Sequence, residues 1–148
     1  MCIKKTNYDN LLSQQSLEIA LTEVKELFNE PYQEQVIMHM IISNYLINGK
    51  NYNSYIDNLR SNNLCLEVKF MSLSNDMAFA LDKILQKYQI KIKQYLDTKY
   101  INNFLKDENI EITEMAFRLK NGYNENEVML VKKNAENKGF FEKFFQLF

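Results

Sequence analysis

The first clear hydrophobic pattern in the chain begins at Ser16. Apolar residues then recur at intervals of three and four positions, which is typical of a helix with one buried face: Leu17, Ala20, Leu21, Val24, Leu27 and Phe28. Ser13 or Ser16 could cap this helix, and Pro31 follows its end. Residues 1–12, which precede it, are mostly polar and irregular. They are predicted to form a flexible arm.

Three later segments have the pattern of β-strands. Residues 35–49 are apolar on both faces, as in a central strand, and end in the turn dipeptide Asn48-Gly49. Residues 64–72 alternate most cleanly, and residues 90–96 alternate again, so both segments are predicted strands. In the second segment, one face consists of Leu64, Leu66, Val68 and Phe70, and the other of Cys65, Glu67, Lys69 and Met71.

The remaining pattern is helical. A second helix is expected to open at Ser74 and Asp76, with a stripe formed by Met77, Ala80, Leu81, Ile84, Leu85 and Tyr88. Shorter helices are expected at 98–106 and 112–120, the second of which ends at Asn121-Gly122. Residues 121–138, which include a short strand candidate at 127–131, are interpreted as a tether.

Together these elements predict an α+β domain over residues 13–120. Its core would be a small three-stranded sheet covered on one side by helices. A C-terminal amphipathic helix would follow the tether.

Composition narrows the range of functions. A chain of 148 residues suffices for one domain, and its net charge of −1 gives no electrostatic case for nucleic-acid binding. No apolar run approaches the ~20 residues of a membrane span, and the N-terminal residues do not resemble a secretory signal. Cys2 and Cys65 lie far apart in the sequence, without partners at metal-ligand spacing. A disulfide framework is therefore not expected, and a reducing cytoplasm fits.

The motifs of common catalytic sites are missing. The sequence has no glycine-rich phosphate loop, HExxH, CxxC or EF-hand loop. The single histidine, His39, lies in an apolar strand, where a histidine is more often a structural residue than a base. A non-enzymatic protein with no metal, cofactor or small-molecule substrate is thus the leading interpretation. An unrecognised enzyme with a polar pocket around His39 is the least favoured alternative.

The C-terminal segment 139–148 predicts contact with a membrane. As a helix it would have an aromatic face and a short polar face, but at ~10 residues it would be stable only when the apolar face is covered. Nearby lysines would favour anionic lipids. The predicted membrane-binding residues are Phe140, Phe141, Lys143, Phe144, Phe145, Leu147 and Phe148. Two alternatives remain: packing on the protein's own core, and binding in a protein groove, as the closing QLF resembles sliding-clamp ligands.

Three ordered stretches resemble FtsA, the actin-like bacterial cell-division protein. They are IMHMIISNYLING (37–49), LCLEVKFMSLSNDMAF (64–79) and LDKILQKYQIKIKQYL (81–96), within a matching region of about residues 16–106. They are similar to the subdomain inserted in its actin core. The FtsA family also ends in an amphipathic membrane-targeting helix. The resemblance implies a bacterial cell-division adaptor on the inner face of the cell membrane, with other division proteins or FtsA-like protomers as partners.

The sequence departs from the FtsA pattern in several places. Ile42 stands where the family often has proline, and the loop 50–63 lacks the usual proline and glycine. No DxGxxxT-type loop is present, so ATP binding and docking of FtsZ do not carry over. The alternative is a truncated FtsA remnant, or a soluble protein-binding domain whose tail packs on its own core.

The membrane prediction can be tested by liposome flotation. The full chain should float with anionic vesicles, whereas a chain ending at Asn137 should stay with the soluble fraction, because it lacks the aromatic face. Vesicles of neutral lipid provide the control for the lysine contribution. Equal flotation of the two chains would contradict the prediction of a C-terminal membrane anchor.

Overall fold

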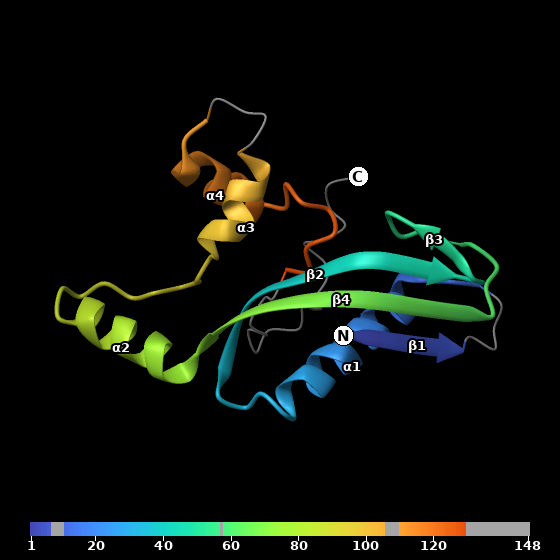
Figure 1. Ribbon diagram of the computed structural model, residues 1–148, viewed down its shortest axis with the longest axis horizontal. Helices are drawn as coiled ribbons and strands as arrows, with labels where there is room; N and C mark the ends of the chain where they lie inside the picture. Colours follow the sequence, from blue (N-terminus) through green and yellow to red (C-terminus); the bar gives the residue numbers. More distant parts are fainter. Residues whose placement is uncertain (7–10, 57, 106–109, 130–148) are drawn as a thin grey trace.

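The computed structural model describes residues 1–6, 11–56, 58–105 and 110–129 (Figure 1). Sheet and helices occur in one α+β fold, which confirms the predicted class. In chain order the elements are β1 (Cys2–Thr6), α1 (Gln14–Asn29), β2 (Gln35–Ile47), β3 (Lys50–Tyr52), β4 (Asn63–Ser74), α2 (Asn75–Gln86), α3 (Thr98–Phe104) and α4 (Ile112–Lys120).

The sheet is antiparallel and has the strand order β1-β4-β2-β3. Its centre is the long pair β2–β4, which runs from Gln35 opposite Ser74 to Ile47 opposite Leu64. Residues 126–128 continue the β3 edge of β2. The N–H of Ile42 donates to the carbonyl of Asn126, and the N–H of Val128 to the carbonyl of Met40, each at 2.8 Å.

Strand β2 contains two β-bulges, which the hydrophobic pattern does not reveal. The register with β4 shifts by one residue between Ile37 and His39, and again between Ile42 and Asn44. Each extra residue reverses which side chains point to a given face. The side chains of β2 on the α1 face are therefore Ile37, Met40, Ile42, Tyr45 and Ile47.

Helices cover both faces of the sheet, rather than the one face expected (Figure 1). On one face α1 packs on the alternating apolar residues of β4, as the pattern at 64–72 predicts. On the other face Ile41 and Met71 pack against a smaller cluster from α3 and α4: Tyr100, Ile101, Met115 and Leu119. The molecule thus has a main core and a second core on opposite sides of β2.

The helices begin and end close to their expected positions. The hydroxyl of Ser13 accepts a hydrogen bond from the N–H of Ser16 and caps α1, and the hydroxyl of Ser74 accepts from Met77 and caps α2. Helices α3 and α4 lie within the ranges 98–106 and 112–120 that the sequence predicts. Their short apolar stripes form the second core.

The structure differs from the sequence prediction at three segments. Residues 90–96 alternate like a strand but are in none. Besides the pairing of β2 with β4, the other long-range pairing between strands is made by β1. Residues 2–6, which the pattern places in a flexible arm, form β1 on the edge of β4. Residues 126–128, which overlap the short strand candidate at 127–131 within the predicted tether, pair with β2. The pairings of β1 and of residues 126–128 join segments far apart in the sequence, and local alternation carries no information about such a partner.

Candidate functional site

The buried His39 joins the sheet to the helices of the second core. It lies on β2 just after the first bulge and is 1% exposed. Its Nε2 atom accepts a hydrogen bond from the backbone N–H of Asp97 at 2.8 Å, and its Nδ1 atom lies 2.7 Å from Oε1 of Glu127. Because a backbone N–H can only donate, the ring proton belongs on Nδ1 and points at the carboxylate.

Glu127 continues this network. The residue is 6% exposed, and its Oε2 atom accepts a hydrogen bond from the hydroxyl of Tyr100 at 2.7 Å. That hydroxyl in turn accepts from the side-chain amide of Asn124 at 2.8 Å. Burial raises the pKa of Tyr100; the Asn124 hydrogen bond lowers it in part, and Glu127 raises it further. The network therefore keeps this phenol neutral.

The network acts as a clamp between elements. His39 comes from β2, Asp97 precedes α3, Tyr100 lies in α3, and Glu127 follows α4. Both nitrogens of the His39 ring are occupied, so neither is free to take a proton from a substrate. The geometry supports the structural interpretation of this histidine. In the described part of the chain, no group of three or more His, Cys, Asp or Glu side chains could hold a metal ion.

The most exposed apolar surface lies on α2. The expected stripe is present, but Met77, Leu81, Ile84 and Tyr88 are between 39% and 72% exposed instead of buried. Figure 1 shows why: α2 continues from β4 beyond the end of the sheet, with only the extended segment before α3 beside it. In that segment the Tyr95 hydroxyl donates to the carbonyl of the buried Ala78 at 3.1 Å. These four exposed residues are called the α2 stripe below.

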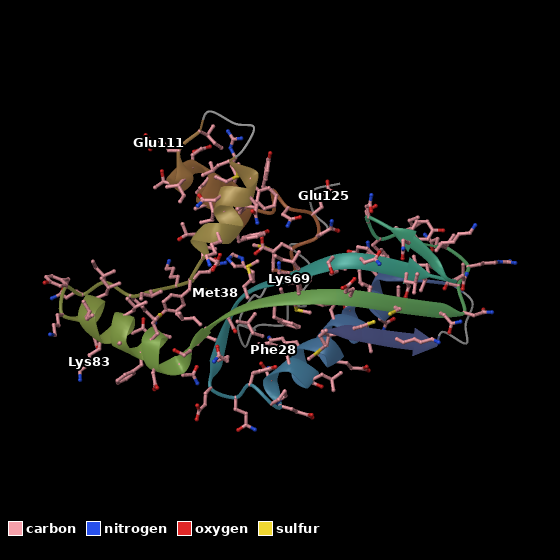
Figure 2. All side chains as sticks on the ribbon, in the orientation of Figure 1. Phe28, Met38, Lys69, Lys83, Glu111 and Glu125 are labelled. Atoms are coloured by element: carbon pink, nitrogen blue, oxygen red, sulfur yellow. The ribbon has the colours of Figure 1, made fainter. Side chains whose placement is uncertain are left out.

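Charged residues lie beside the α2 stripe, with an acidic residue at the start of the helix and basic residues at its end. Asp76 lies in the first turn of α2 and Lys83 in the last, and Asp82 and Lys87 are exposed as well. Figure 2 shows that Lys83 projects from α2 away from the rest of the molecule. On a helical projection at 100° per residue, Asp76, Lys83 and Lys87 share one flank of the stripe. That flank is acidic at its start and basic at its end.

The structure brings together the two cysteines that the sequence separates. The Sγ atoms of Cys2 and Cys65 lie 2.8 Å apart, on the neighbouring strands β1 and β4. The expectation that the chain has no disulfide framework rested on their distance along the chain. Only the strand order, which the sequence does not reveal, places them side by side.

All of the predicted membrane-binding residues of segment 139–148 lie outside the described residues. Their contact with lipid stays a prediction. Among the helices of the described residues, none has the length and apolar character to span a membrane.

Part of the chain is similar to a known protein. The chain is 33% identical over 98 residues to the signal recognition particle subunit SRP68 of Saccharomyces cerevisiae. The match covers 57% of this chain but only 16% of SRP68. No family model matches the sequence.

This match contradicts the FtsA-like interpretation. The similarity is to a subunit of the signal recognition particle from a eukaryote, not to a bacterial cell-division protein. The predicted role as a divisome adaptor, and its alternative as a truncated FtsA, are therefore wrong. The resemblance rested partly on a strand at 90–96, which the structure does not contain.

The clamp predicts how much the free energy of unfolding falls when the hydroxyl of Tyr100 is removed. Replacing Tyr100 with Phe leaves Oε2 of Glu127 and the amide of Asn124 without this partner, which should lower the free energy of unfolding by about 1–3 kcal/mol. Tyr32→Phe is the matched control, because Tyr32 is half exposed. Urea unfolding of both variants measures the difference. An equal effect of the two substitutions would contradict the clamp.

The raised pKa of Tyr100 also predicts sensitivity to alkali. A phenol whose pKa is raised in the folded state favours folding below its unfolded pKa of about 10, and this contribution falls as pH rises above that value. The free energy of unfolding of the native chain should therefore fall more steeply between pH 9.5 and 11 than that of Tyr100→Phe, by up to about 1.4 kcal/mol per pH unit. Tyr32→Phe, which removes a half-exposed hydroxyl, is the control for the loss of a tyrosine. Identical slopes in all three proteins would overturn this assignment.

Proposed function

We propose that this chain is a non-enzymatic assembly subunit that associates with a second copy of itself through the α2 stripe. The observation that carries the proposal is the exposure of Met77, Leu81, Ile84 and Tyr88 in a single row. Met77, Leu81 and Ile84 have the spacing i, i+4 and i+7 of a helix that packs lengthwise against another helix, and Tyr88 follows in the turn after α2. An exposed apolar row of this kind favours an interaction surface over a solvated helix face.

The charges on α2 favour a second copy as the occupant. When two identical helices pack antiparallel about a two-fold axis, the same flank of each helix meets. Asp76 of one copy then lies near Lys87 of the other, and the reverse contact is identical. Opposite charges at the two ends of one flank thus make the surface complementary to itself.

The contact should be reversible. Full burial of four large apolar side chains contributes roughly 6–12 kcal/mol, against an association cost of about 4–15 kcal/mol. Because the gain and the cost are of similar size, the net association should be weak. Such a contact suits a subunit that a larger assembly holds in place through several surfaces.

The name of the matching yeast protein also supports an assembly role. SRP68 is a subunit of a multi-component particle. The match spans a small part of that protein. It therefore supports a role in some assembly, and not membership of a particular particle. With a net charge of −1, the chain favours protein over nucleic acid as its partner. Attachment to an anionic membrane stays a separate prediction, based on the tail sequence alone.

Sedimentation equilibrium of the full chain tests the proposal. The apparent mass should rise from one copy toward two as the protein concentration increases into the hundreds of micromolar. Ile84→Glu should stay monomeric, because it places a charge in the centre of the stripe. Ile19→Glu on α1 is the matched control, since Ile19 is 50% exposed and outside the stripe, and it should associate like the native chain. A native chain that stays monomeric would contradict the proposal.

Charge exchange tests the antiparallel arrangement. Asp76→Lys and Lys87→Asp should each weaken association about 3- to 10-fold, because each places like charges opposite one another. The double variant should recover the native affinity, since it restores both pairs. Additive losses in the double variant would contradict this arrangement. Association that occurs only in a chain ending at Asn137 would identify the tail, not a second copy, as the occupant.

A further inference from the structure

The register of β1 on β4 places two thiols on one face of the sheet. Lys4 lies opposite Cys65 and Cys2 opposite Glu67, so the cysteines are two positions apart across the strand pair. Their Sγ atoms approach to 2.8 Å, although the residues are 63 positions apart in the chain. They are the only cysteines in the sequence. Cys2 is exposed and Cys65 is partly exposed, so small molecules in solution can reach the pair.

We propose that Cys2 and Cys65 form a reversible redox pair, which reacts with low-molecular-weight disulfides of the glutathione class and closes a disulfide between β1 and β4. A disulfide requires two sulfur atoms at about 2.05 Å, so closure needs a movement of less than 1 Å from the observed contact. This site is independent of the α2 stripe. It lies on β1 and the start of β4, whereas α2 follows the end of β4.

The reaction proceeds by two exchanges. The thiolate of Cys2 attacks one sulfur of the small disulfide, a mixed disulfide forms, and the first small thiolate leaves and takes up a proton. The thiolate of Cys65 then attacks the Cys2 sulfur of the mixed disulfide, and the second small thiolate leaves and is protonated. Two protein thiols are oxidised to one disulfide, and one small disulfide is reduced to two thiols.

The surroundings assign different roles to the two thiols. Cys2 is the more exposed, and so it is the thiol that meets the oxidant first. Burial raises the pKa of Cys65 to about 11, with the hydrogen bond to Cys2 adding to the shift and Lys4 opposing it. Cys65 therefore holds its proton in the reduced state and acts in the second exchange.

Closure of the disulfide would fix the edge of the sheet. Strand β1 has five residues and pairs with β4 alone. A cross-link between residues so far apart in the chain restricts the unfolded state strongly. The oxidised protein should hold β1 in place and keep the β4 edge covered, whereas the reduced protein relies on the strand hydrogen bonds alone.

Thiol titration and intact mass measure the proposed reaction directly. The full chain, at low micromolar concentration in a glutathione redox buffer, should lose both free thiols and two hydrogen atoms of mass, and remain monomeric on a non-reducing gel. The oxidised form should unfold on the order of 10 °C higher than the reduced form. Cys2→Ser and Cys65→Ser should each gain only a glutathione adduct. A native chain that forms only adducts or cross-linked dimers, or an internal disulfide that does not raise the unfolding temperature, would overturn the proposal.

A second measurement separates the fold's contribution from general thiol reactivity. If the fold holds the sulfur atoms together, the equilibrium constant for closing the disulfide should be about 100-fold larger in buffer than in a denaturing concentration of urea. Equal constants under the two conditions would show that the strands do not position the pair, and would overturn the proposal. The single-cysteine variants, with no internal partner, should show no such difference in adduct formation.

Discussion

The arrangement of this protein depends on one buried contact, between the imidazole of His39 and the carboxylate of Glu127. It joins residues 88 positions apart in the chain, at a place where both side chains are almost fully buried. A buried carboxylate is costly unless its oxygens are hydrogen-bonded, and here the imidazole and the phenol of Tyr100 each donate to one oxygen. With the bond from Asp97, the contact ties the start and end of the α3–α4 unit to β2.

This clamp determines which surfaces remain for binding. Helices α3 and α4 are held against one face of β2, and α1 covers the opposite face. Helix α2 leaves the sheet between these units and has a single buried residue, Ala78. Its apolar row is left uncovered because α2 runs beyond the end of the sheet (Figure 1). We interpret the network as structural and the α2 stripe as the surface that binds a second copy of the chain.

Much of the local structure could be predicted from the sequence, because the local patterns match what each segment buries. The alternation at 64–72 predicts both faces of β4, and the periodicity after Ser16 predicts α1. The long-range features could not be predicted. Residues 90–96 alternate like a strand, but within the described part of the chain no strand pairs with them. The pentapeptide of β1 is too polar to stand out, and its pairing is what brings Cys2 to Cys65.

For the candidate sites as well, the sequence predicts the individual residues but not their long-range partners or their exposure. The position of His39 within an apolar strand predicts a satisfied structural histidine. Its partner Glu127 begins the short strand candidate 127–131 inside the predicted tether, and nothing in the sequence pairs the two residues. The first bulge in β2, which no residue pattern marks, places His39 opposite Met71, a residue that packs on the second core. The α2 stripe could be predicted residue by residue, but its exposure depends on the direction in which α2 leaves β4.

The most direct test of the clamp is an NMR measurement of the His39 ring. His39 is the only histidine in the chain, so its ring signals need no separate assignment. The structure predicts a scalar coupling across the hydrogen bond between the amide nitrogen of Asp97 and Nε2 of His39, together with a proton on Nδ1. A ring with its proton on Nε2 and no coupling to Asp97 would contradict the clamp and the structural role of this histidine.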